Sequence, residues 1–335
     1  MPDLVESMFY VGETPWHGKG VPLTESPTIE DALILAGMDW QVQKIPTTFQ
    51  LYDGDSLDGN YINKETGHFV NVRMDSMEVV GNVGAKYEVL QNEDAFKPFS
   101  VLVDYGYKFE TAGVIDNGKK VWILAKTPNS YLVGDDKILD YVMLYTSHDG
   151  SSGSCFRDVA IRVVCQNTLD SALSSRSTSE YKLKHTSSIK SRVDELTKNL
   201  DKREGNVNQA IGWMNRFHET PLNDAEFTFY VEAVMPWLKT RHKVSNKELG
   251  ILVRNRALPV YNTIDDLFRN GKGNKGETLW DAYNAITEYH DHHKKHKDWV
   301  KGTQFGQSRI DKRNAFYYAT KVAQTKQNDT IITYN

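Results

Sequence analysis

Residues 138–173 read ILDYVMLYTSHDGSSGSCFRDVAIRVVCQNTLDSAL, and this stretch decides the fold of the chain. Two apolar runs rich in β-branched and aromatic residues, 138–146 and 155–165, flank a turn of Ser, His, Asp and Gly, which predicts a β-hairpin. Asn167 or Thr168 can cap a helix directly behind the second run. The stretch therefore predicts two antiparallel strands that lead into a helix.

The same pattern continues towards the N-terminus. Residues 108–115 and 119–127 form another pair of strand-like runs, and they are joined by Asp116-Asn117-Gly118. Asn-Gly is a preferred tight turn between antiparallel strands. The four runs predict an antiparallel β-meander packed with helices, which is the α+β class rather than a doubly wound sheet. Further strand-like runs lie upstream, at residues 41–52, 69–74 and 77–83.

Helical spacing replaces the strand pattern in the C-terminal part of the chain. Long helices are predicted over residues 189–218 and 277–299. Shorter ones are predicted to start at Asn223 and Ser245 and to lie at residues 264–268 and 310–323. We therefore divide the chain into an α+β domain, residues 1–187, and a mainly helical C-terminal subdomain, residues 188–335.

The composition indicates an ordinary globular protein, since 39% of the 335 residues are hydrophobic and 25% are charged. No apolar run is long enough to cross a membrane, and the N-terminus lacks the pattern of a secretory signal. We therefore expect a cytosolic protein with no membrane partner. The cysteines, Cys155 and Cys165, lack a CxxC spacing and are interpreted as small strand residues.

Charge is divided unevenly along the chain. Residues 1–118 hold 7 Lys and Arg against 19 Asp and Glu, a balance of −12, and the remaining residues hold 33 against 25, a balance of +8. Basic clusters are the electrostatic signature of nucleic-acid binding, although a charged surface is usually just a solvated one. We therefore expect any polyanion to bind to the part of the chain after residue 118.

Motifs for nucleotide-driven or hydrolytic chemistry are missing from the sequence. There is no GxxxxGK[ST] motif, and no GxGxxG joins a strand to a helix. No GxSxG elbow surrounds the serines that follow His148, so a serine hydrolase is not favoured. These absences predict a non-enzymatic protein without a cofactor.

Basic and aromatic residues interleave at positions 181–185, Tyr-Lys-Leu-Lys-His. An aromatic ring can hold an unstacked base, worth about 1 to 3 kcal/mol, while lysines bind phosphates. The alternative is that Tyr181 and Leu183 simply form a strand face. Arg157 and Arg162 have opposite parity on their strand, so at most one can point into a core. The predicted nucleic-acid contacts are Lys119, Lys120, Lys126, Arg157, Arg162, Arg176, Tyr181, Lys182, Lys184, His185, Lys190 and Arg192.

One predicted helix near the C-terminus offers a different chemistry. Glu288, His292 and His296 are spaced four apart, which places them on one helical face at a spacing suited to a divalent ion, and Asp291 lies beside them. Neighbouring lysines lower the affinity for a cation, so a solvated helix end is the default interpretation. The alternative function is a metal-dependent nuclease that uses these four residues.

Several segments together resemble a known family. They are residues 15–18 (PWHG), 87–92 (YEVLQN), 162–169 (RVVCQNTL), 184–186 (KHT), 284–289 (NAITEY) and 291–292 (DH). In this order they are similar to proteins of phages and plasmids catalogued as a domain of unknown function, family 932. The resemblance implies a mobile-element origin and the cytosol of a bacterial host. It supplies no activity and no catalytic residues.

A second resemblance concerns the layout of the fold. A curved antiparallel meander followed by a helix, with basic residues along its hairpins, is similar to ring-forming single-strand annealing proteins of phage recombination. This resemblance implies an ATP-independent, homo-oligomeric protein that binds single-stranded DNA and acts in annealing or recombination, although a fold alone does not fix function. A third hypothesis is an interaction protein that counters a host defence, with its acidic N-terminal surface mimicking nucleic acid.

Overall fold

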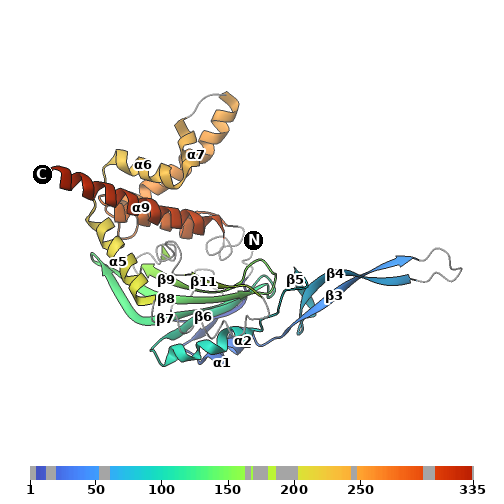
Figure 1. Cartoon of the computed structure of the whole chain (residues 1–335). Helices are drawn as coiled ribbons and strands as arrows, with labels where there is room; N and C mark the ends of the chain where they lie inside the picture. The colour runs from blue at the N-terminus through green and yellow to red at the C-terminus, as the bar shows by residue number, and fades with distance from the viewer. Residues whose placement is uncertain are drawn as a thin grey trace.

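A computed structural model describes residues 5–12, 20–52, 61–162, 167–168, 180–185, 203–242, 247–296 and 306–333. Figure 1 shows two β-sheets built from the N-terminal part of the chain and a layer of helices built from the C-terminal part. The α+β class with C-terminal helices is confirmed.

The main sheet is built around the predicted meander. Its strands in chain order are β1 (Val5–Val11), β2 (Val21–Leu23), β6 (Lys108–Ile115), β7 (Lys120–Val133), β8 (Asp136–Ser147), β9 (Ser154–Arg162), β10 (Asn167–Thr168) and β11 (Glu180–Leu183). β6, β7, β8 and β9 pair antiparallel with their neighbours in sequence, so the four-stranded meander is confirmed. β1 and β2 extend the sheet beyond β6, while β10 and β11 both pair with β9. The predicted helix caps Asn167 and Thr168 are therefore strand residues, and the helix expected behind them falls on residues outside the described ranges.

Side-chain alternation gives the main sheet two apolar faces. On one face, buried Phe109, Ile123 and Phe156 share a core with helical residues. The helical segments of this core are α1 (Ile29–Leu35), α2 (Asn92–Phe96) and η1 (Lys97–Val103). The opposite face carries a separate cluster around Met143 and Val159. Figure 1 shows α1 and α2 on one side of the sheet and the C-terminal helices on the other.

A smaller sheet forms an arm that projects from the body (Figure 1). Its strands are β3 (Val42–Tyr52), β4 (Tyr61–Arg73) and β5 (Glu78–Val83), in that order. A bulge interrupts the β3–β4 register where Gly67 adopts a φ of 74°. Thr66 Oγ1 donates to the Thr47 carbonyl at 3.1 Å across this bulge. Bulges bend a strand and raise its twist, so the bulge separates the base of the arm from its outer half.

The helical part differs from the predicted boundaries at three places, one of which is the last helix, which runs over Gln307–Thr333 and not over 310–323. Its elements are α5 (Arg203–Glu219), α6 (Asp224–Val234), η3 (Pro236–His242), α7 (Lys247–Asn270), α8 (Leu279–Glu288), η4 (Tyr289–His293) and α9 (Gln307–Thr333). The short helices predicted near 245 and 264 are one helix, α7, which continues through Pro259. Burial of Ala257, Ile264 and Phe268 in the helical core outweighs the cost of an interior proline, about 3 kcal/mol. The helix predicted over 277–299 ends earlier, in a π-helical turn at η4.

The helical layer and the main sheet share a hydrophobic core. Val133 and Ile138 lie beside the turn of the β7–β8 hairpin, and they pack in the same cluster as the helical residues. Trp280 on α8 donates its indole N–H to Asp136 at 2.7 Å. The division of the chain near residue 187 stays a prediction. No helix within the described part of the chain is both long and apolar enough to span a bilayer.

Gly81 on β5 lies directly against the backbone of the β8–β9 turn. A Cβ at this position would lie 2.5 Å from the Cα of Asp149, in the β8–β9 turn. We expect Gly81→Ala to lower the free energy of unfolding by about 1 to 3 kcal/mol, because the backbones must move apart. Urea denaturation measures this loss. Gly84→Ala is the matched control, since its Cβ would meet nothing within 4 Å, and an equal midpoint for both variants would contradict the close contact.

Candidate functional site

The turn of the central hairpin lies at a junction of polar residues from five segments of the chain. The base of the arm contributes Asn71, the segment before α2 contributes Tyr87, and α2 contributes Asn92. The turn itself contributes His148 and Asp149, and the segment after β11 contributes His185. We call these six residues the polar junction. The family-like segment 87–92 and residues 184–185 of another such segment, which are far apart in sequence, meet here.

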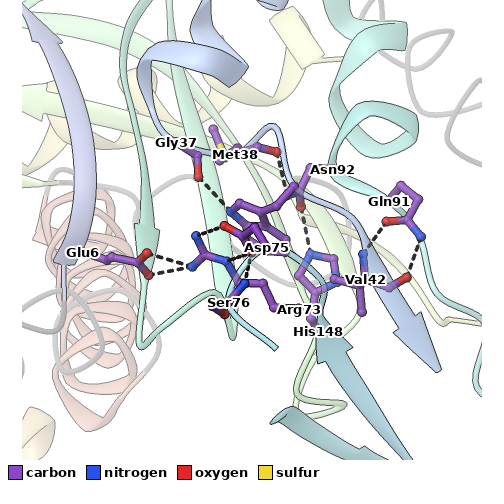
Figure 2. A network of polar contacts seen from close by, with 11 residues as sticks. Glu6, Gly37, Met38, Val42, Arg73, Asp75, Ser76, Gln91, Asn92 and His148 are labelled. Carbon is purple, nitrogen blue, oxygen red and sulfur yellow. Dashed lines mark hydrogen bonds and ion pairs between the residues drawn. The ribbon is translucent and has the colours of Figure 1, made fainter. Parts of the chain in front are cut away.

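His148 is held in one orientation by three hydrogen bonds. Its backbone N–H donates to the Lys119 carbonyl at 2.8 Å, and its own carbonyl accepts from Asn71 Nδ2 at 2.7 Å. Its ring Nε2 lies 2.8 Å from Asn92 Oδ1. Because Asn92 Nδ2 donates to the Met38 carbonyl at 2.9 Å, the amide presents its oxygen to the imidazole (Figure 2). His148 must therefore carry its proton on Nε2, which leaves Nδ1 as a buried acceptor without a hydrogen-bond partner.

An aromatic and cationic stack closes the other side of His148. The Trp40 ring meets the imidazole edge-on at 5.3 Å, and the Arg73 guanidinium lies 4.5 Å from the Trp40 ring centre. Arg73 also bridges Glu6 and Asp75, each at 2.8 Å, as Figure 2 shows. The hydrogen bond from Arg73 holds the pKa of Asp75 below its usual value. This bridge joins β1 to the base of the arm.

His185 packs flat against Tyr87. The ring centres are 4.7 Å apart, and the planes differ by 12°. His185 Nδ1 lies 3.2 Å from the Glu88 carbonyl, so Nδ1 is the donor and Nε2 is left without a partner. The Tyr87 hydroxyl donates to the Ser147 carbonyl at 3.0 Å, which ties this stack to the turn.

The histidines of the polar junction are neutral at physiological pH. Burial, assisted by the neighbouring imidazole of His185, lowers the pKa of His148 to about 3. Burial also lowers the pKa of His185. Burial raises the pKa of Asp149, but hydrogen bonds from Ser151 and the charge of Lys120 more than offset this, so the net pKa is lowered. The junction therefore holds its charge in the Lys120–Asp149 pair, at 3.1 Å, and not on its imidazoles.

The structure does not gather the predicted sheet cations into one exposed lane. Lys119 and Lys126 form ion pairs of 3.1 Å with Asp116 and Glu110, respectively. Arg157 is only 1% exposed and donates to Met143 Sδ at 3.0 Å. Together with the Lys120–Asp149 pair, these contacts turn the sheet cations towards internal partners.

The other predicted contacts lie at the β9–β11 edge or outside the described residues. Lys184 is exposed, and its neighbour His185 is buried in the polar junction. For Arg162, Tyr181 and Lys182 the structure describes the backbone, which runs in β9 and β11. Arg176, Lys190 and Arg192 lie outside the described residues.

The predicted metal ligands are not brought together. Glu288 is buried at the end of α8, while the π-helical turn leaves His292 exposed. Asp291 forms a buried ion pair with Lys312 of α9, and His296 Nε2 donates to the His290 carbonyl at 3.1 Å. Within the described ranges, no group of three or more His, Cys, Asp or Glu residues is placed to hold a metal ion.

The same region contains a buried Ser–His–Asp arrangement that the sequence pattern did not reveal. His290 Nδ1 lies 3.0 Å from Ser308 Oγ, and its Nε2 lies 3.6 Å from Asp311. Burial lowers the pKa of His290 and raises that of Asp311. Because Ser308 is 1% exposed, this arrangement joins η4 to α9 and offers no accessible nucleophile. No sequence signal could find it, since the partners are separated by 18 residues or more.

The buried histidine at the turn predicts a pH-dependent stability. An unfolded chain protonates His148 near pH 6.5, whereas the folded chain resists protonation down to about pH 3. Stability should therefore fall as the pH is lowered through this window, with a slope of up to about 1.4 kcal/mol per pH unit from this group. Urea denaturation between pH 4 and pH 7 should show a shallower slope for His148→Gln. His68→Gln, at an exposed position on the arm, should keep the wild-type slope, and equal slopes for all three proteins would contradict the assignment.

The Asp291–Lys312 pair predicts a large loss of stability when one partner is removed. Their atoms are 2.8 Å apart, and the side chains are 1% and 0% exposed. We expect Lys312→Met to cost about 3 to 5 kcal/mol, because a buried carboxylate loses its counter-charge. The double variant with Asp291→Leu should recover part of the loss in a urea titration. Arg313→Met, at the exposed next position, is the control, and a Lys312→Met protein as stable as this control would refute the buried pair.

Comparison with known proteins identifies the family. A family profile described as "Domain of unknown function (DUF932)" matches residues 79–329, from within β5 to near the end of α9. No curated protein and no solved structure shows significant similarity to the chain. The matched residues include most of the polar junction and the described helical layer except the last turn of α9, and they make up well over half of the chain. The chain therefore belongs to the DUF932 family.

Proposed function

We propose that the protein binds single-stranded nucleic acid without catalysing a reaction, at the edge of the polar junction. The observation that carries this proposal is the Tyr87–His185 stack, with ring centres 4.7 Å apart, in which each ring is preceded in the chain by an exposed lysine. Lys86 precedes Tyr87, and Lys184 precedes His185. We call these four residues the stacking edge.

The chemistry of the stacking edge suits an unpaired strand. Single-strand sites combine flat rings, which hold bases of any sequence, with cations that bind the phosphates. At the stacking edge the ring offered to a base is that of the partly exposed Tyr87, because His185 is buried and supports it from one side. Burial keeps His185 neutral, so the positive charge comes from Lys86 and Lys184. Among the described residues, neither lysine forms an ion pair. The lysines of the main sheet, in contrast, are paired with carboxylates.

The backbone beneath Lys86 is fixed before any ligand arrives. Lys44 of β3 donates to the carbonyls of Ala85 and Tyr87 at 3.0 and 2.7 Å, respectively. The backbones of Glu88 and His185 are also joined by a hydrogen bond of 3.2 Å. A preorganised edge loses less conformational entropy when it binds, which favours affinity.

The proposed contact surface lies elsewhere than the one predicted from the sequence, but it uses the same kinds of residue, lysines beside aromatic rings. Lys184 and His185 remain, while the paired or buried cations Lys119, Lys120, Lys126 and Arg157 are left out. Strand annealing or recombination in a phage or plasmid is the biological role that this binding would serve. The absence of an assembled metal site in the described residues gives the nuclease alternative no specific support.

Binding of a fluorescein-labelled oligothymidylate, followed by fluorescence anisotropy, tests the proposal. We expect Lys86→Glu with Lys184→Glu to weaken binding roughly tenfold or more at low salt. The slope of log affinity against log salt should fall by about 0.7 for each phosphate that the variant no longer neutralises. Glu88→Lys should strengthen binding, because an exposed carboxylate on the same segment becomes a cation.

Lys321→Glu, on the exposed surface of α9, is the control for the added negative charge. It should bind like the wild type. If the wild-type protein does not bind, or if all four proteins bind with the same salt slope, the proposed function is wrong.

A further inference from the structure

One face of the base of the arm leads outwards from the polar junction. Lys44 of β3 pairs directly with Asn71 of β4, and the next pair on the same face, one row further out, is Pro46 with Phe69. Asn71 Nδ2 donates to the His148 carbonyl at 2.7 Å, so this is the face that meets the turn of the central hairpin. Phe69 therefore lies on the same surface as the junction, one row further out along the arm.

The ammonium group of Lys44 joins this face to the stacking edge. Its Nζ donates to the carbonyls of Ala85 and Tyr87 at 3.0 and 2.7 Å, and it lies 5.0 Å from the centre of the Phe69 ring. A cation within about 6 Å of a ring centre is attracted to the ring. A single side chain thus holds the backbone of Tyr87 and the ring of Phe69 next to each other.

The ring of Phe69 is not committed to a core. It is partly exposed, and it is not a member of any hydrophobic cluster in the described part of the chain. Ala85 and Lys86, which precede Tyr87, are exposed on the neighbouring segment. A flat ring that is partly open to solvent therefore lies beside the backbone that carries the first lysine of the stacking edge.

We infer that the single-strand site continues from the stacking edge onto the base of the arm, where Phe69 holds a second base. This inference rests on the proposed function and adds to it the course of the strand. A strand with one base on Tyr87 reaches Phe69 with a neighbouring nucleotide, because the same ammonium contacts both residues. Stacking tolerates every base, so the second ring lengthens the site without giving it a sequence preference.

Lys44 is a positioning residue in this site. A lysine ammonium has three N–H donors, and Lys44 gives two of them to backbone carbonyls. Its charge is therefore used within the protein, unlike that of the exposed Lys86. We expect Lys44→Met to weaken binding while the slope of log affinity against log salt stays that of the wild type, and a slope lower by about 0.7 would instead identify Lys44 as a phosphate contact.

Fluorescence anisotropy with a fluorescein-labelled oligothymidylate tests the role of Phe69. Phe69→Leu keeps an apolar side chain beneath Lys44 but has no flat ring, so it should weaken binding roughly fivefold or more. Its salt slope should not change, because no phosphate contact is lost. Phe69→Trp, which keeps a flat ring, should bind at least as tightly as the wild type. The matched control is Phe49→Leu, the same change at a 44% exposed position on the outer half of the arm, and it should bind like the wild type.

A photocrosslink tests the same contact by proximity. Phe69→p-benzoylphenylalanine should form a covalent adduct with the oligothymidylate under near-ultraviolet light, and an excess of unlabelled strand should suppress the adduct. The same replacement of Phe49 should give none. Urea denaturation checks that each variant is folded, and the adduct decides the question if Phe69→Leu is not.

Either an unchanged affinity of folded Phe69→Leu or the absence of an adduct at position 69 would overturn the inference. Equal losses in Phe69→Leu and Phe69→Trp would do the same, because they would show that the position needs an exact fit and not a flat ring. If Lys86→Glu with Lys184→Glu weakens binding while Phe69→Leu does not, the extension alone is wrong. A wild type that does not bind removes the proposed function itself, and the extension with it.

Discussion

The structure depends on the burial of an uncharged imidazole, His148, at the turn of the central hairpin. A polar ring can be buried there only because Asn92 accepts its N–H, and Asn92 is oriented in turn by the Met38 carbonyl. The carbonyl of His148 is satisfied by Asn71. These contacts join the turn to α2 and to the base of the arm, so the hydrogen bonds of this one residue link three separate segments of the chain.

The cost of burying a polar group without a partner also divides the charged side chains of the protein into two groups. Within the body, Lys120, Lys126 and Lys312 have carboxylate partners, because an unpaired charge near a core is costly. At the stacking edge, Lys86 and Lys184 flank aromatic rings and face solvent. A surface that binds a polyanion needs cations of the second kind, and a count of basic residues along the sequence does not distinguish the two.

Much of the fold could be predicted because it is encoded in local patterns. Alternating apolar residues indicated the meander of β6 to β9, and Asn117-Gly118 marked its first turn. The helical layer followed from spacing and capping residues such as Asn223, which forms the capping box of α6 with Glu226. The candidate site was predicted in part: Lys184 and His185 were singled out, but Tyr87 entered only as part of a family-like segment, and the contact of Asn92 with His148 was not predicted.

The sequence by itself determined the α+β class and the order of the four meander strands, since those strands are neighbours in the chain as well as in the sheet. Only the tertiary structure decided that Arg157 is buried, that Asp291 pairs with Lys312, and that α7 continues through Pro259. Each of these outcomes depends on a contact or a shared core with residues far away in sequence. Periodicity reports which face of an element is apolar, but it carries no information about which distant side chain that face will meet.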